Sequence, residues 1–95
     1  MPTIYYPAIV ERAASGGYGV FFPDLPGCVS AGSTEQKAAE GAEEALHLHL
    51  AGLIEDGDPL PVPTQLDQVV IEPDIAVAAR LLVRGVVPAK AVRIN

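Results

Sequence analysis

Residues 34 to 56 impose the strongest constraint on the fold, because their apolar residues recur at the spacing of one long helix. At about 100° per residue, these side chains fall on one arc and most acidic side chains fall on the opposite side. The arc consists of Ala38, Ala39, Ala42, Ala45, Leu46, His49, Leu50 and Leu53. Such a helix must cover another apolar surface, and the rest of the chain has to supply it.

Both ends of this helix carry recognisable signals. The segment Ser33-Thr34-Glu35-Gln36 predicts a capping box, in which a hydroxyl and a glutamine three residues later satisfy the free amides of the first turn. Gly57 is a natural stop, and the proline-rich residues 58 to 63 indicate a stiff connection. After it, Thr64 could cap a short helical turn over residues 65 to 70.

Strand periodicity precedes the helix. Alternating apolar residues between Ile4 and Arg12 predict a strand with one buried face. This face consists of Ile4, Tyr6, Ala8 and Val10. Pro7 has no amide hydrogen, so we expect a bulge or an unpaired side there. Residues 13 to 17 suit a hairpin turn, and residues 18 to 22 form the returning strand.

Three further segments are predicted as strands: residues 28 to 32, Ala79 to Val87, and Ala91 to Ile94. The order β-β-β-α-β predicts an α+β domain, in which a three-stranded antiparallel sheet is followed by one long helix and one or two further strands. We expect a single domain over residues 1 to 95. Its parts are a core over 1 to 57, a proline-rich connection over 58 to 65, and a short helical turn with terminal strands over 66 to 95.

The charge balance favours a protein partner over nucleic acid. Twelve acidic and six basic side chains give a net charge of -6, which repels phosphate backbones and attracts a basic protein. A domain of 95 residues buries a modest core, so we also expect a homodimer or homotetramer. No basic segment precedes an apolar run, and no stretch approaches 18 apolar residues, so we expect a cytoplasmic protein without a membrane span.

Few residues are candidates for chemistry. Asp24 is expected to cap its own turn, and Glu11 is its only obvious carboxylate companion. His47 and His49 lie about 200° apart on the helix and cannot chelate one ion as an i, i+4 pair would. Cys28 is the only cysteine and is expected to be buried and inert. The sequence therefore predicts no catalytic residue, no metal site and no cofactor.

Two surfaces are candidates for protein contacts. Alternation places one aromatic of the second strand opposite its neighbours, where an exposed ring could anchor a partner. With the proline-rich loop that follows, the predicted partner-binding residues are Phe21, Asp24, Leu25 and Pro26. The second candidate is a ridge of small residues beside the apolar arc, which would admit close approach of another backbone. Its members, the predicted oligomer contacts, are Gly41, Ala45, Leu48 and Gly52.

Three sequence segments together resemble the amino-terminal domain of the HicB antitoxin family: YPAIVE, GGYGVFFPDLPGCVSAGST and EGAEEALHLHLAGLIEDGDPLPVP. Their order and spacing are specific, and the resemblance covers about residues 1 to 65. It implies a partial ribonuclease-H-like fold without nuclease activity or cofactors. It also implies binding of HicA, a small basic toxin that cleaves mRNA, by covering the active site of the toxin.

Typical family members also carry a carboxy-terminal DNA-binding domain. Residues 91 to 95 resemble the strand that begins a ribbon-helix-helix segment, and the sequence ends there without its two helices. The resemblance therefore does not imply operator binding by this chain. Two alternatives to an antitoxin stay open: an orphan HicB-like oligomeric module that has no toxin, and a ribonuclease-H-like hydrolase, against which the lack of paired carboxylates argues.

Overall fold

The computed structural model describes residues 3 to 87 and contains four strands and one long helix. In chain order the elements are β1 (Thr3–Arg12), β2 (Tyr18–Phe21), β3 (Val29–Gly32), α1 (Glu35–Glu55), a 3-10 helix η1 (Leu66–Gln68) and β4 (Val77–Val86). The strand expected at Ala91 to Ile94 lies outside the described residues. Within the described part, no helix is long and apolar enough to span a bilayer.

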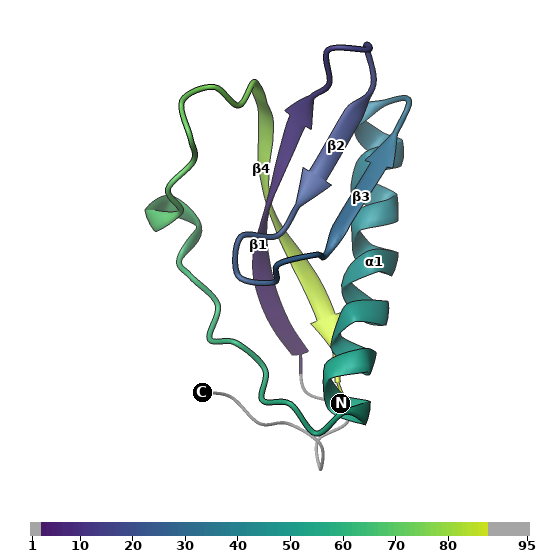
Figure 1. Ribbon diagram of the computed structural model, residues 1–95, viewed down its shortest axis with the longest axis vertical. Helices are drawn as coiled ribbons and strands as arrows, with labels where there is room; N and C mark the ends of the chain where they lie inside the picture. The colour runs from purple at the N-terminus through teal and green to yellow at the C-terminus, as the bar shows by residue number, and fades with distance from the viewer. Residues whose placement is uncertain (1–2, 88–95) are drawn as a thin grey trace.

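The four strands form one antiparallel sheet in the order β3-β2-β1-β4. The last strand in the sequence therefore pairs along the free side of the first. Figure 1 shows α1 against one face of this sheet and the connection between α1 and β4 on the other side. The expected α+β architecture is confirmed, and the fourth strand extends the same sheet.

The face of the sheet under α1 forms the core. The predicted alternation along β1 is confirmed, because all four residues of its predicted face are buried. The helix contributes Ala38, Ala42, Leu46 and Leu50, which are buried as well. At Gly85 of β4, a Cβ atom would lie 2.6 Å from Leu50 Cδ1. The absence of a side chain at this position lets the helix approach the sheet closely.

The capping box predicted at the start of α1 is not formed, because the cap is Thr34 and not Ser33. Thr34 is the N-cap, and its hydroxyl oxygen accepts the Lys37 amide hydrogen at 3.1 Å. The third residue after this cap is a lysine, so the predicted reciprocal glutamine bond is wrong, and Gln36 donates to Glu40 instead at 3.0 Å. At the other end Gly57 has a φ of 73°, which closes the helix as predicted.

Residues on the opposite face of β1 are also buried, which the alternation did not predict. Pro7 and Ile9 are inaccessible although they point away from α1, because the connection after α1 lies over this face and buries Val69 there. Pro7 keeps the regular pairing of β1 with β4, and the shift in register between these strands lies between Val10 and Glu11. Pro7 is beyond the end of β2, so β1 has no paired strand on that side.

Candidate functional site

The residues considered for chemistry do not form a reactive cluster. Among residues 3 to 87, no group of three or more histidine, cysteine, aspartate or glutamate side chains could hold a metal ion. Cys28 is buried, and burial raises the pKa of its thiol, which keeps it protonated and weakly nucleophilic. His47 is exposed on α1 and His49 is half-buried.

The proline-rich loop between β2 and β3 binds the chain's own connection. Asp24 accepts two hydrogen bonds from Thr64, from the amide at 2.8 Å and from the hydroxyl at 2.6 Å. The prediction that Asp24 caps its own turn is therefore wrong. Helix capping by Thr64 is also wrong, because the N-cap of η1 is Gln65 and no side chain caps this helix. Leu25 is buried in the core, Phe21 is half-buried and Pro26 is exposed. A partner contact by this set stays a prediction.

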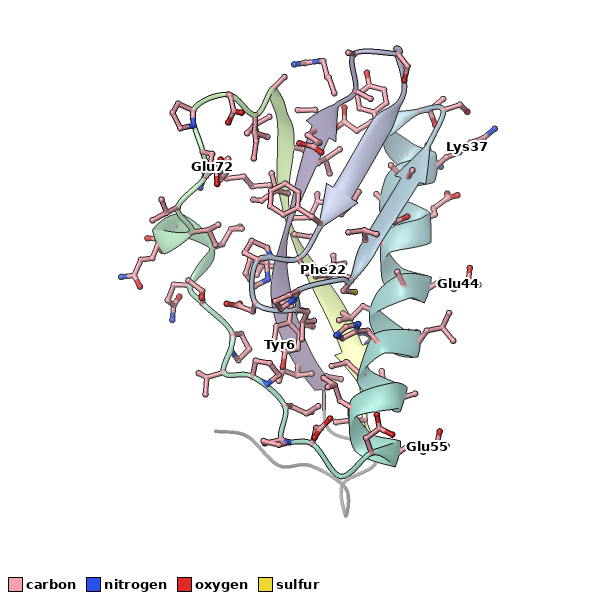
Figure 2. The ribbon with its side chains drawn as sticks, in the orientation of Figure 1. Tyr6, Phe22, Lys37, Glu44, Glu55 and Glu72 are labelled. Carbon is pink, nitrogen blue, oxygen red and sulfur yellow. The ribbon has the colours of Figure 1, made fainter. Side chains whose placement is uncertain are left out.

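A second bond ties the same connection to β1. The Tyr6 hydroxyl donates to the carbonyl oxygen of Pro61 at 2.6 Å, beside the buried Leu60. Figure 2 shows Tyr6 between the sheet and this part of the chain. Burial, together with the nearby charge of Asp24, raises the pKa of Tyr6 to about 12. The phenol is thus held protonated in the folded protein.

Ionisation of Tyr6 should lower the free energy of unfolding at high pH. Because its folded pKa of about 12 exceeds the ordinary value of 10.0, the bond contributes fully below pH 10 and is lost as pH rises towards 12. We expect Tyr6→Phe to cost about 1 kcal/mol at pH 7, the net value of one hydrogen bond. The difference in the free energy of unfolding between the variant and the original protein, measured with denaturant, should narrow from pH 10 to 12. A gap that stays constant over this range would contradict the assignment.

The outward surface of α1 is acidic. Its exposed charges are Glu35, Lys37, Glu40, Glu43, Glu44 and Glu55, of which one is basic. Figure 2 shows Lys37, Glu44 and Glu55 pointing away from the sheet. Leu48 lies among these carboxylates with 70% of its surface exposed. This side of α1 is called the acidic face below.

Two residues of the predicted ridge on α1 pack on the sheet, and the other two are exposed to solvent. A Cβ at Gly41 would meet the Ser30 hydroxyl of β3, and Ala45 packs against the core. Both residues are therefore explained by packing of the helix on the sheet. Leu48 and Gly52 are exposed, and a Cβ at Gly52 would meet nothing within 4 Å. An oligomer contact at this ridge stays a prediction.

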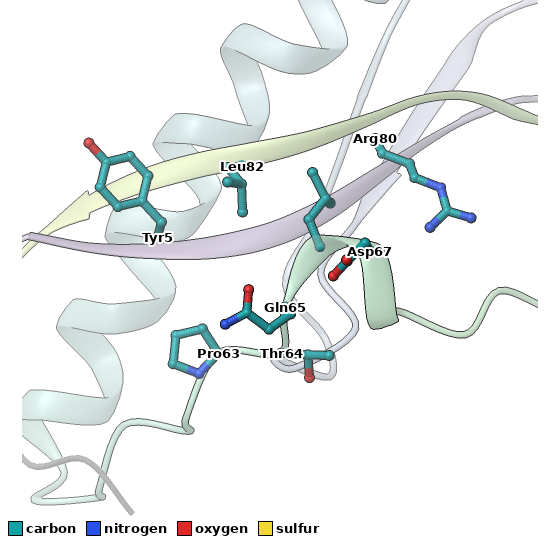
Figure 3. Close-up of a pocket in the computed structure, with 8 residues that line it drawn as sticks. Tyr5, Pro63, Thr64, Gln65, Asp67, Arg80 and Leu82 are labelled. Carbon is teal, nitrogen blue, oxygen red and sulfur yellow. The ribbon is translucent and has the colours of Figure 1, made fainter.

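A groove of about 750 Å³ lies on the sheet face away from α1. Figure 3 shows Tyr5 and Leu82 on the strand side and Pro63 and Gln65 on the connection. Arg80 and Asp67 also line it. No local pattern in the sequence marks this groove, although the alternation that buries Tyr6 places Tyr5 on the other face. The path of the connection, which forms the second wall, carries no local sequence signal.

Comparison with known proteins identifies the family of this chain. Residues 6 to 95 match the model of the HicB-like antitoxins of bacterial toxin-antitoxin systems. The chain belongs to this HicB-like family. It is 34% identical to antitoxin HicB 1 of Photorhabdus laumondii over 77 residues, which is 81% of this chain and 50% of that protein. The chain spans about half the length of the curated relatives it matches.

Solved HicB structures share the fold. The amino-terminal domain of Burkholderia pseudomallei antitoxin HicB superposes with a TM-score of 0.70 and 28% identity, covering 84% of this chain and 95% of that one. A chain of a HicA3 and HicB3 toxin-antitoxin complex matches with a TM-score of 0.63 and 26% identity, covering 97% of this chain and 99% of that one. The resemblance to HicB amino-terminal domains predicted from three sequence segments is thus confirmed over the fold as a whole.

Proposed function

We propose that this HicB-like chain is an antitoxin that neutralises a small basic HicA-type toxin by binding it and masking its active site. The observation that carries the proposal is the family match over residues 6 to 95. It is supported by the likeness to a chain found in a HicA3 and HicB3 toxin-antitoxin complex. Masking requires a complementary surface and no catalysis, so the protein acts without enzymatic activity or a cofactor.

The acidic face of α1 is the surface that best suits a basic toxin. Its carboxylates lie on one rigid helix, so their potentials add over one side of the molecule and attract a positively charged partner. Leu48, exposed among them, supplies apolar area that a partner could bury. Attraction of this kind raises the association rate and weakens as salt screens the charges.

Reversing two charges on this face should weaken toxin binding. We expect Glu40→Lys/Glu44→Lys to lower affinity for a purified HicA-type toxin by about 100-fold or more, because close charge pairs at interfaces are each worth about 1.5 kcal/mol or more. Calorimetry at two salt concentrations measures this loss. The original protein should itself bind less tightly at the higher concentration.

Glu72→Lys/Asp74→Lys is the matched control, because it changes the net charge equally at exposed positions on the connection. It should leave affinity within about threefold of the original, since charges outside a contact act weakly through solvent. Equal losses in both double variants would show that net charge alone matters, and would remove the assignment to α1. No binding to any HicA-type toxin would reject the antitoxin function.

A further inference from the structure

β4 forms one edge of the sheet, because the strand order is β3-β2-β1-β4 and β4 pairs only with β1 among the described residues. Between residues 3 and 87, the backbone groups on its other side therefore have no strand partner. This edge is ten residues long, from Val77 to Val86. An unpaired edge of this length is a template on which an extended chain can form a further strand.

β4 borders a hollow on each face of the sheet. On the face away from α1, Arg80 and Leu82 line the groove described above (Figure 3). On the opposite face, a smaller hollow of about 340 Å³ lies between Leu81 of β4 and Ala39 of α1. Its other lining residues are Val10, Glu35 and Gln36. Neighbouring residues of one edge strand thus line hollows on opposite faces.

The side chains of a strand added to β4 would alternate between these two hollows, because successive side chains point to opposite faces of a sheet. A side chain beside Leu81 would lie at the smaller hollow, where Leu81 and Ala39 are only half-buried. A side chain beside Leu82 would lie at the groove, where Leu82 is 54% exposed. Both hollows therefore favour apolar side chains at the centre of the added strand.

Two arginines select the ends of the added strand. Arg80 and Arg84 are exposed on the same face of β4, two residues to either side of Leu82. Opposite charges on facing strands are favourable, and like charges directly opposite each other are destabilising. Asp67 also lines the groove, but it lies on the connection and not on the edge strand. The edge therefore prefers carboxylates beside the two arginines and an apolar residue between them.

This chain does not itself supply such a strand near the edge. Residues 88 to 95 read PAKAVRIN and contain two basic side chains and no acid. A second β4 paired antiparallel about Leu82 would set Arg80 opposite Arg84. The net charge of -6 repels an acidic segment at a distance, but charges are screened beyond about 8 Å at physiological salt, so the adjacent arginines act more strongly.

We propose that the free edge of β4 binds an extended acidic-apolar segment of another protein, which joins the sheet as a further strand. Its pattern is two acidic residues four positions apart with three apolar residues between them, as in Glu-Val-Leu-Val-Glu. Backbone hydrogen bonds to β4 give affinity, and contacts with Leu82, Arg80 and Arg84 give specificity. The site uses neither Glu40 nor Glu44, so it does not depend on the proposed antitoxin function.

Fluorescence anisotropy with a labelled, end-capped Glu-Val-Leu-Val-Glu peptide and the full chain tests the proposal. The chain should bind it at least about tenfold more tightly than Lys-Val-Leu-Val-Lys, because two close attractions become repulsions. Arg80→Glu/Arg84→Glu should reverse this preference. Arg12→Glu/Lys37→Glu is the matched control, because it changes the net charge equally at exposed positions outside the edge and should keep the preference.

N-methylated peptides test the strand pairing without any change in the protein. In a strand, the amides of alternate residues point to the same side, so only one set can donate to β4. One peptide is methylated at both valine amides, and another at the amides of leucine and the second glutamate. One of them should bind about tenfold more weakly, the effect of losing two hydrogen bonds, and the other should bind as the parent does.

Four results would overturn the proposal: no binding of the acidic peptide, equal effects of the two methylated peptides, an unchanged preference in Arg80→Glu/Arg84→Glu, or tighter binding of a labelled single-stranded RNA. The last would assign the arginines to phosphate groups. Circular dichroism shows whether the variants fold, and the methylated pair decides if they do not. Toxin binding is measured separately, so either proposal can fail without the other.

Discussion

Gly32→Ala should destabilise the protein by about 3 kcal/mol, the upper end of what overpacking of a core usually costs. Gly32 ends β3 where the strand passes beneath the first turn of α1. A Cβ there would lie 2.5 Å from the Ala38 nitrogen and 2.8 Å from the Lys37 carbonyl carbon. Both atoms belong to the helix backbone, which cannot rotate away as a side chain can. Urea unfolding measures the loss as a lower midpoint.

Gly52→Ala, on α1, is the matched control for Gly32→Ala. A Cβ at Gly52 meets no atom within 4 Å, and alanine is favoured over glycine inside a helix by about 0.5 to 1 kcal/mol. This variant should therefore be slightly more stable than the original. An unchanged midpoint for Gly32→Ala would show that β3 and α1 can separate at little cost, and would contradict the close packing described here.

Asp24→Ala should also cost about 3 kcal/mol. The carboxylate accepts both the amide and the hydroxyl hydrogen of Thr64, and hydrogen bonds to charged groups contribute about 1.5 to 3 kcal/mol each, with incomplete additivity. Without them the connection loses its attachment to the loop between β2 and β3. We expect a lower unfolding midpoint and faster hydrogen exchange at the Thr64 amide.

Thr64→Val separates the two bonds. It removes the hydroxyl donor and keeps the amide donor, so we expect a loss of about 1.5 kcal/mol and an amide that stays protected from exchange. If Asp24→Ala costs no more than Thr64→Val, the amide bond contributes nothing and the role assigned to Asp24 is wrong. Both variants change the connection only at its attachment to the loop.

Elements built from neighbouring residues were predictable. The apolar arc of α1, the stop at Gly57 and the alternation along β1 depend on positions at most a few residues apart, and the structure confirms all three. The capping box was wrong because the helix cap lies one residue later than predicted, at a threonine that follows a serine. Both side chains carry a hydroxyl that can cap a helix, so the sequence does not distinguish them. The family resemblance rested on the same local segments and is confirmed.

Contacts across long stretches of sequence were not predictable. Asp24 and Thr64 are 40 residues apart and Tyr6 and Pro61 are 55 apart, so no local pattern shows that they bond. These bonds hold the connection over the second sheet face, bury Ile9 and form the groove beside Tyr5. Periodicity shows which side chains share a face, because backbone geometry repeats along the chain. Only tertiary packing decides which segment covers that face and which side chains are left exposed for a partner.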